Sequence, residues 1–176
     1  SVNDPEGVIE WDPALTDQVD YEAELAVVIG KKARNVAASE AMDVIFGYTC
    51  ANDVTARDLQ EGDGQWVRGK SLDTFGPLGP AITTRDAIAR PDNLAIACRV
   101  NGETVQSSNT RELIFGIPAL IEFITRAFSL FPGDIIMTGT PHGTGGFQTP
   151  PRYLKTGDVV EVEIEQLGVL RNTCRE

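Results

Sequence analysis

Apolar and polar positions along this chain predict mostly β-strands. Residues 19–29 begin with alternation and end in the apolar run Leu25-Ala26-Val27-Val28-Ile29, which is typical of a strand that enters a core. Asn101-Gly102 is the strongest hairpin signal and joins a strand at 94–100 to a return strand ending at Ser107. Further strands are expected at residues 48–52, 135–137 and 159–161.

Helical signals are few and short. Residues 39–46, closed by Gly47, predict a short capped helix, and another is expected to start near Thr55. The longest helix is expected at 117–128, with Pro118 in its first turn. Its apolar stripe comprises Leu120, Ile121, Ile124 and Phe128.

The remaining segments complete the predicted organisation. Residues 61–80 are rich in glycine and proline and are expected to form a long ordered loop. Residues 1–18 are polar and turn-rich and are expected to form an extended entry segment to one domain at 19–176. The fold class is therefore strand-rich α+β, with few helices and a mixed or antiparallel sheet.

Composition narrows the classes of partner. The chain has 15 Lys and Arg against 26 Asp and Glu, so its net charge of −11 disfavours nucleic acid and anionic membranes. It has no membrane-spanning apolar run, and its first residues do not resemble a signal peptide. Three widely spaced cysteines argue against a disulfide scaffold and fit a reducing cytoplasm. The single histidine, His142, largely excludes a site built from several imidazoles.

Acidic residues occupy alternate positions at the start of the first long strand. In a regular strand Asp20, Glu22 and Glu24 share one face, about 6.6–6.8 Å apart. Such a row repels itself and raises its own pKa values unless a hard divalent cation binds to it. The alternative is a solvent-facing strand edge that carries acidic residues against aggregation. The residues alone leave both interpretations open.

A second group of polar residues lies where a strand gives way to a short helix. Asp53 could cap that helix, or Thr55 could cap it and leave Asp53 as a third metal ligand. Arg57 and Gln60 are three positions apart, so they share a helix face and could contact one anionic substrate. The alternative for Arg57 is a surface ion pair with Asp58 or with another acid.

Two loops add further candidates. Lys70 would be solvated in an ordinary loop, but beside an acidic metal centre it could neutralise an enolate or a carboxylate. The glycine-rich residues 138–146 could approach an anion closely, although they match neither a P-loop nor a dinucleotide fingerprint. His142 in this loop could act as a base, but the favoured interpretation is a surface residue.

Six stretches, in order along nearly the whole chain, resemble the catalytic domain of the fumarylacetoacetate hydrolase family. They are DYEAEL (20–25), NDVTARDLQ (52–60), GKSLDTFGPLGP (69–80), VNGE (100–103), PGDIIMTGTP (132–141) and GDVVE (157–161). The resemblance implies a mixed β-sandwich roll with few short helices, and usually a homodimer. It also implies Mg²⁺ or Mn²⁺ held by Glu22, Glu24 and Asp53, with Asp20 as a neighbour of the ligands.

The resemblance assigns the other site residues as well. Lys70 matches the active-site lysine of the family, and Arg57, Gln60 and Thr140 match positions that contact substrate. Many members also carry a His-Glu pair on an upstream lid segment, where it activates water. The sequence contains no segment that matches this pair.

The function implied first is a divalent-metal-dependent hydrolase that cleaves a C–C bond in acylpyruvate-type 2,4-diketo acids. The alternatives are an isomerase or decarboxylase of 2-hydroxy-dienoic diacids from aromatic meta-cleavage pathways, or an oxaloacetate decarboxylase. From a different class, a non-catalytic metal-binding module remains open. The expected partner is a small-molecule keto acid.

Overall fold

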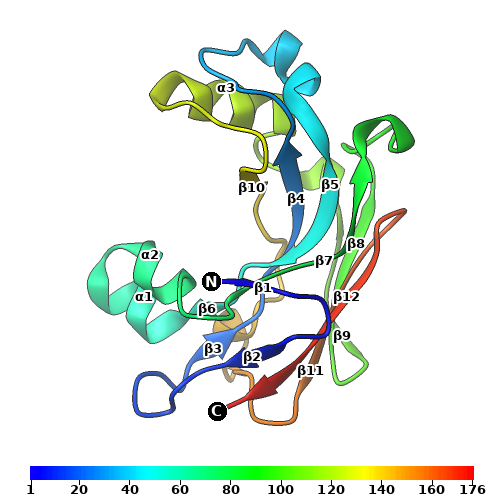
Figure 1. Cartoon of the computed structure of the whole chain (residues 1–176). Helices are drawn as coiled ribbons and strands as arrows, with labels where there is room; N and C mark the ends of the chain where they lie inside the picture. Colours follow the sequence, from blue (N-terminus) through cyan, green and yellow to red (C-terminus); the bar gives the residue numbers. More distant parts are fainter.

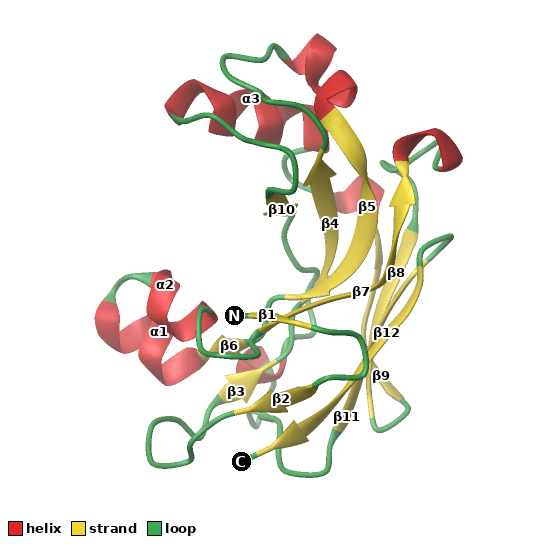
Figure 2. Ribbon diagram, viewed as in Figure 1, coloured by secondary structure: helices red, strands yellow, loops and turns green.

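The computed structural model describes all residues, 1–176, and consists mainly of β-strands (Figures 1 and 2). One five-stranded sheet has the order β1-β7-β5-β4-β10, and a second has the order β2-β12-β11-β8-β9. Strands β3 and β6 form a separate pair. The predicted strand-rich fold with few short helices is confirmed.

The elements have the following bounds. The strands are β1 (Val2–Asn3), β2 (Val8–Glu10), β3 (Val19–Asp20), β4 (Ala23–Ile29), β5 (Ile45–Asn52), β6 (Thr55–Ala56), β7 (Gly76–Thr84), β8 (Ala95–Val100), β9 (Glu103–Asn109), β10 (Ile135–Met137), β11 (Val159–Ile164) and β12 (Gly168–Arg175). The α-helices are α1 (Arg57–Asp63), α2 (Trp66–Lys70) and α3 (Ile117–Ala127), and the 3₁₀ helices are η1 (Ala38–Val44), η2 (Arg85–Ala87), η3 (Thr110–Glu112) and η4 (Gly145–Phe147). Each helix is too short to cross a bilayer as an apolar span.

The core lies between the two five-stranded sheets, which contact each other through β4, β5 and β7 on one side and β8, β11 and β12 on the other. Leu25, Val27 and Ile29 of β4 belong to this core. Each such side chain stabilises the fold by about 1.5–3 kcal/mol when fully buried. Because side chains alternate along a strand, Glu24 and Ala26 face the opposite side of β4.

The pairing of β4 with β5 determines which residues meet at the end of this sheet. The strands are antiparallel, with Ala23 opposite Asn52 and Glu24 opposite Ala51. One residue further along, the Asp53 N–H donates to the Glu22 carbonyl at 2.9 Å. The register therefore brings Asp53 beside the acidic strand from a segment about 30 residues away in sequence.

Two local predictions are confirmed with their expected geometry. The Asn101-Gly102 turn joins β8 to β9, and both residues have positive φ, 53° and 79°, which the two-residue hairpin turn requires. Helix α3 starts with Ile117 and Pro118. Phe128, in contrast, does not belong to the buried stripe, because the backbone becomes extended at this residue and its side chain is 58% exposed.

Other local predictions are corrected or completed by the structure, mainly through sheet pairing. The short capped helix expected at 39–46 is the 3₁₀ helix η1, which has no side-chain cap and ends before Gly47, because β5 already starts at Ile45, which pairs with Ile29. Residues 61–80 are not a continuous loop, since they contain the end of α1, all of α2 and the start of β7. The extended entry segment 1–18 is not contradicted, since it contains the extended strands β1, which pairs with β7, and β2, which pairs with β12.

The strand predicted at 19–29 is interrupted. Residues 19–20 form β3 and pair with β6, whereas β4 starts at Ala23 and pairs with β5. The break changes the direction of the chain between Asp20 and Glu24, and this change decides which acidic side chains meet.

The cysteines agree with the expectation of free thiols. Cys50, Cys98 and Cys174 are buried and unpaired. Cys50 and Cys98 belong to the core between the two sheets. Burial raises the pKa of all three thiols, so they are poor nucleophiles at neutral pH.

Candidate metal and active site

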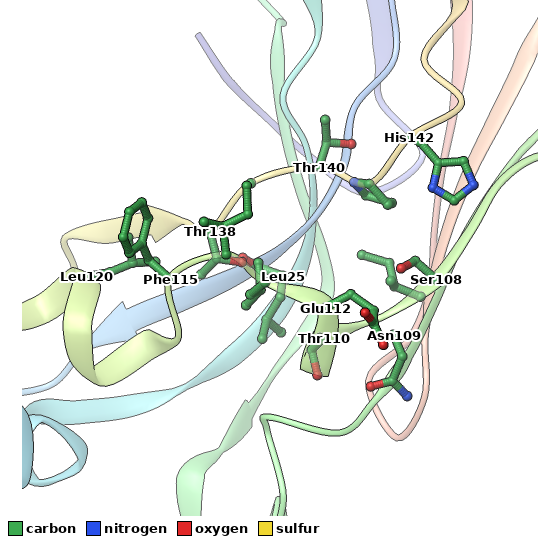
Figure 3. Close-up of a pocket in the computed structure, with 15 residues that line it drawn as sticks. Leu25, Ser108, Asn109, Thr110, Glu112, Phe115, Leu120, Thr138, Thr140 and His142 are labelled. Atoms are coloured by element: carbon green, nitrogen blue, oxygen red, sulfur yellow. The ribbon is translucent and has the colours of Figure 1, made fainter.

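A cavity of about 420 Å³ adjoins the segment that follows β10 (Figure 3). Thr138, Thr140 and His142 line one side of it, and Ser108 and Asn109 lie across from them. The acidic residues Glu22, Glu24 and Asp53 are not among its lining residues. His142 is exposed at this cavity, which agrees with the interpretation of a surface residue.

Three carboxylates converge at the end of β4 and β5. Oxygen atoms of Glu22, Glu24 and Asp53 all lie within 4.8 Å of one another. Glu22 and Glu24 are only 7% and 3% exposed, so the cluster is held in the interior and is not a solvated strand edge. Hard divalent cations prefer carboxylate oxygens, and this donor set could hold Mg²⁺ or Mn²⁺.

Lys70 points its ammonium group into this acidic triad, defined as Glu22, Glu24 and Asp53. Its Nζ donates to Glu22 Oε2 at 2.9 Å, to Asp53 Oδ2 at 2.5 Å and to Thr55 Oγ1 at 2.9 Å. Burial alone would lower the pKa of Lys70, but the Glu22 and Asp53 carboxylates outweigh burial and raise it. Lys70 is therefore a charged ammonium at neutral pH.

A close approach between helices carries Lys70 to the triad. Lys70 is the last residue of α2, which contacts α1 and β6. The preceding residue is Gly69, where a Cβ would lie 2.9 Å from both the Ala56 carbonyl and the Gln60 nitrogen. Glycine therefore lets α2 lie against these two elements, and a loop lysine becomes part of the cluster.

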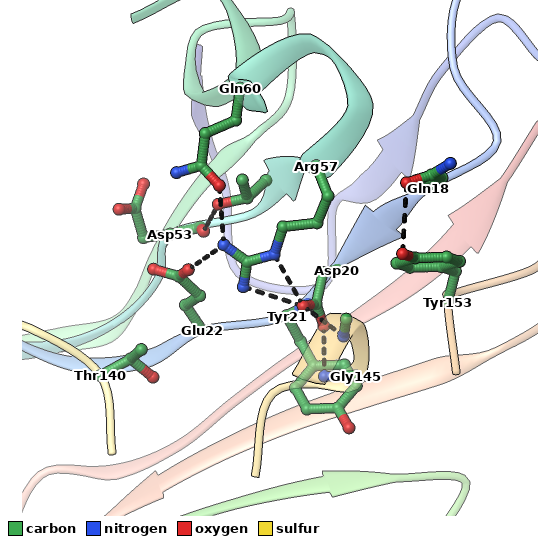
Figure 4. Close-up of polar contacts among 12 residues, drawn as sticks. Gln18, Asp20, Tyr21, Glu22, Asp53, Arg57, Gln60, Thr140, Gly145 and Tyr153 are labelled. Carbon is green, nitrogen blue, oxygen red and sulfur yellow. Dashed lines mark hydrogen bonds and ion pairs between the residues drawn. The ribbon is translucent and has the colours of Figure 1, made fainter. Parts of the chain in front are cut away.

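Arg57, at the start of α1, is the second cation of the site (Figure 4). Its Nε and Nη2 lie 2.9 and 2.8 Å from Asp20 Oδ2. Its Nη1 lies 2.7 Å from Glu22 Oε1 and 3.1 Å from Gln60 Oε1. The predicted shared face of Arg57 and Gln60 is thus formed. The alternative of a surface Arg57 is wrong, because Arg57 is only 5% exposed, although it does pair with acids, namely Asp20 and Glu22.

Asp20 does not join the triad as a regular strand would require. Its carboxylate accepts hydrogen bonds from the backbone N–H groups of Gly145 and Gly146 and contacts Arg57. The interruption between β3 and β4 separates Asp20 from Glu22 and Glu24. Of the three alternate acidic residues, Asp20 therefore holds Arg57, whereas Glu22 and Glu24 converge with Asp53.

Neither Asp53 nor Thr55 caps α1. The N-cap is Ala56, without a side-chain hydrogen bond. Thr55 lies in β6, where its hydroxyl donates to the Asp53 carbonyl at 2.8 Å and accepts from Lys70. The Asp53 side chain is consequently available to the triad, although the reason differs from the predicted one.

The segment after β10 approaches the triad through its backbone. The Gly139 N–H donates to Glu24 Oε2 at 2.6 Å. The next residue is Thr140, whose hydroxyl accepts from Gln106 Nε2 at 2.9 Å. Gln106 also accepts from the Ala23 N–H at 3.0 Å and so holds this segment against β4. Nothing in the sequence near Gln106 indicates this role, because its partner is 83 residues away.

Asn52 is a further site residue that sequence reasoning missed. It is 1% exposed, and its Oδ1 accepts from the Glu22 N–H at 2.9 Å. Its Nδ2 is buried without a hydrogen-bond partner. As the last residue of β5 it precedes Asp53, and its position opposite Ala23 was available only from the register of the sheet.

The formal charges of the site do not cancel. Four carboxylates are joined by two cations, so 2 − 4 leaves two negative charges. The groups are Asp20, Glu22, Glu24, Asp53, Arg57 and Lys70. Two uncompensated charges on convergent carboxylate oxygens match the charge of one divalent cation.

Glu24 carries most of this imbalance. Arg57 contacts Asp20 and Glu22, and Lys70 contacts Glu22 and Asp53, whereas Glu24 has no ion pair. Burial, and then the neighbouring Asp53 carboxylate, raise the pKa of Glu24 to about 8. A cation between the three carboxylates would remove this repulsion, so the residues present fit a divalent metal ion.

Comparison with known proteins agrees with the sequence resemblance. A family model described as Fumarylacetoacetate (FAA) hydrolase C-terminal matches residues 1–175. This chain belongs to the fumarylacetoacetate hydrolase family. The family membership and the strand-rich fold expected from the sequence are therefore confirmed.

Individual relatives of this family member include enzymes with named reactions. The chain is 53% identical over 161 residues to "Oxaloacetate tautomerase Fahd2a, mitochondrial" of Rattus norvegicus, covering 91% of this chain and 51% of the relative. The chain thus spans about half the length of the curated relatives it matches.

Solved structures of the family superpose closely on this chain. A fumarylacetoacetate hydrolase from psychrophilic Exiguobacterium antarcticum has a TM-score of 0.97 and 44% identity, over 99% of this chain and 63% of that one. A 2-hydroxyhepta-2,4-diene-1,7-dioate isomerase from Mycobacterium marinum has a TM-score of 0.86 and 41% identity, over 98% of this chain and 63% of that one.

Proposed function

We propose that this chain is a divalent-metal-dependent tautomerase or isomerase of small α-keto acids, and that oxaloacetate is the substrate to test first. The observation that carries the proposal is a buried acidic triad with a protonated lysine between two of its carboxylates. The rat relative, named as an oxaloacetate tautomerase, supports this choice of substrate.

Tautomerisation moves one proton between the carbon beside a carbonyl and the carbonyl oxygen, and negative charge develops on that oxygen. A divalent ion held by Glu22, Glu24 and Asp53 would polarise the oxygen as a Lewis acid. The Lys70 ammonium, fixed by hydrogen bonds to two of these carboxylates, stabilises the same negative charge. Its raised pKa keeps Lys70 charged, which suits electrostatic stabilisation and disfavours the roles of base and of proton donor.

Substrate carboxylates need donors beside this centre. Arg57 is a candidate, because its guanidinium lies between Asp20 and Glu22 of the acidic triad. Asn52 Nδ2 is a second candidate, because it is a buried donor without a partner. Gln60, on the same face of α1 as Arg57, and the hydroxyl of Thr140 complete the proposed substrate contacts.

The isomerase alternative fits these residues better than the hydrolase that the resemblance implied first. Hydrolysis of a C–C bond needs a base that activates water. Glu22, Glu24 and Asp53 would all be ligands of the ion and so none would be free to act as the base, and His142 lines the cavity described above and not the triad. Tautomerisation consumes no water. The dienoate isomerase from Mycobacterium marinum supports a second substrate class with the same enolate chemistry.

The decisive assay follows the loss of the enol absorbance of oxaloacetate with the purified chain in Mg²⁺, in Mn²⁺ and in EDTA. We expect acceleration of enol-to-keto conversion that requires the metal. Pyruvate release from oxaloacetate and cleavage of an acylpyruvate are measured on the same preparation. Metal-dependent acylpyruvate cleavage without any enol conversion would restore the hydrolase and refute the proposal.

A non-catalytic metal-binding module is separated from an enzyme by oxalate binding. A catalytic Mg²⁺ or Mn²⁺ keeps positions for exchangeable ligands, whereas a structural Ca²⁺ site closed by protein oxygens does not. Calorimetry should detect oxalate binding only when Mn²⁺ is present. Metal binding without oxalate binding or turnover would favour the module.

We further propose that the chain forms a homodimer. Large apolar side chains are exposed at the loop before α3 and on α3 itself: Ile114 is 91% exposed, Phe115 65% and Phe123 76%. Exposed apolar groups of this kind are typical of association surfaces. Sedimentation equilibrium should give twice the chain mass of 19.0 kDa, and Ile114→Asp should shift the mass toward a monomer. A wild-type monomer would refute this.

A further inference from the structure

Asp20 is buried at 0% exposure, yet it is not one of the converging carboxylates. Its Oδ1 accepts from the Tyr21 N–H at 2.8 Å and the Gly145 N–H at 2.7 Å, and its Oδ2 accepts from the Gly146 N–H at 2.8 Å and from Arg57 Nε at 2.9 Å. A carboxylate in the interior is tolerated only when it is well paired, and Asp20 meets this condition. Apart from its neighbour Tyr21, its partners come from two separate parts of the chain.

The first partner is a tight turn, η4, whose backbone lies directly on the carboxylate. A Cβ at Gly145 would lie 1.9 Å from the Arg152 carbonyl and 2.9 Å from Asp20 Oδ1, so only glycine fits there. The turn ends in Phe147, which is 80% exposed. The centroid of its ring lies 5.5 Å from Arg57 Cζ, so the aromatic face covers the guanidinium.

The second partner is Arg57, whose two edges have different contacts (Figure 4). Asp20 holds the edge that carries Nε and Nη2. The opposite nitrogen, Nη1, is directed at Glu22 Oε1 and Gln60 Oε1. Because a guanidinium is planar, holding one edge fixes the direction of the other. The contacts run from Asp20 through Arg57 to Glu22 of the acidic triad.

We propose that Asp20 is a positioning residue, which holds Arg57 and the Gly145–Phe147 turn as one unit so that Arg57 meets the substrate in a fixed orientation. The identity of the substrate in this inference rests on the proposed function, whereas the contact between Asp20 and Arg57 does not. Without the Asp20 charge, the guanidinium would lose its anchored edge and could turn fully toward Glu22. Substrate binding should then weaken more than the chemical step.

The kinetic test combines Asp20→Asn, Arg57→Met and the double variant. A hydrogen bond to a charged group is worth a factor of about ten or more, so Asp20→Asn should raise KM about tenfold and change kcat much less. If Asp20 acts through Arg57, the same substitution should have little further effect in the Arg57→Met background. Fully additive effects on kcat/KM would overturn the proposal.

A spectroscopic test keeps the inference separate from the proposed activity. In ¹⁵N-labelled protein the Arg57 Nε–H signal, assigned by its loss in Arg57→Lys, should exchange slowly with solvent because it is buried and bonded to Asp20. Asp20→Asn should shift this signal and speed its exchange. An unchanged signal would overturn the proposal. If oxaloacetate is not a substrate, the proposed function fails and this measurement still decides the role of Asp20.

Two further variants guard against simple misfolding. Gly146→Ala leaves Asp20 intact but places a Cβ 3.2 Å from Asp20 Oδ2 and 3.3 Å from Arg57 Cγ, so it should raise KM in the same direction. Asp17→Asn changes an exposed carboxylate on the same segment and should leave KM and the Arg57 signal unchanged. If Gly146→Ala leaves both readouts at the wild-type value, the turn is not part of the unit.

Discussion

Glu24 offers a direct test of the charge imbalance in the acidic triad. It is 3% exposed, accepts a hydrogen bond from the Gly139 N–H and has no cationic partner. Burial, followed by repulsion from Asp53, raises its pKa to about 8. Glu24→Gln keeps the size and one acceptor oxygen of the side chain but removes its charge.

Proton linkage gives the sign and size of the effect that Glu24 has on the free energy of unfolding as pH changes. The carboxyl of Glu24 titrates at 4.5 in the reference state and at about 8 in the folded protein, so the folded protein binds this proton more tightly. As pH rises between these values, the unfolded chain loses the proton first and the free energy of unfolding falls. At about 1.4 kcal/mol per pH unit, the loss is on the order of 5 kcal/mol, and it is complete above about pH 8.

Urea unfolding in EDTA, at intervals from about pH 5 to about pH 8, measures this loss. The unfolding free energy of wild type minus that of Glu24→Gln should fall with pH, and the subtraction removes the contribution of groups that do not interact with Glu24. Glu40→Gln, at an exposed position, should give a difference from wild type that does not vary with pH. A wild-type minus Glu24→Gln difference that is constant, or rises with pH, would refute the reasoning about Glu24.

Three other outcomes are expected. Lys70→Met should lower kcat for enol conversion by about 10²–10³-fold. Its Mn²⁺ affinity, measured by calorimetry, should stay the same or increase, because the substitution removes a positive charge beside the ion. The control Lys31→Met, at an exposed position, should change neither quantity. Asp53→Asn should weaken Mn²⁺ binding in the same titration, and wild-type affinity for Mn²⁺ after this change would exclude Asp53 as a ligand. Because the ion competes with a proton on Glu24, wild-type Mn²⁺ affinity should rise with pH up to about 8 and then level off, whereas a profile flat between about pH 6 and 8 would contradict the assignment.

The sequence by itself determined the features that depend on near neighbours. The apolar run of β4 indicated a core strand, and Asn101-Gly102 indicated the hairpin because only residues that accept positive φ fit its turn. The spacing of Arg57 and Gln60 placed both on one helix face. The ordered family motifs also led to the family and to the fold class. Each of these features follows from local geometry, or from a sequence pattern that can be recognised without knowing which distant residues come into contact.

Only the tertiary structure decided how the charged groups pair. Alternate spacing placed Asp20 with Glu22 and Glu24, but the pairing of β3 with β6 turned it toward Arg57 and the Gly145 turn. Lys70 contacts the triad because α2 lies against α1. No local signal in its glycine-rich segment indicates this packing of the two helices. These contacts join residues far apart in sequence, so their geometry depends on sheet register and helix packing that neighbouring residues do not encode.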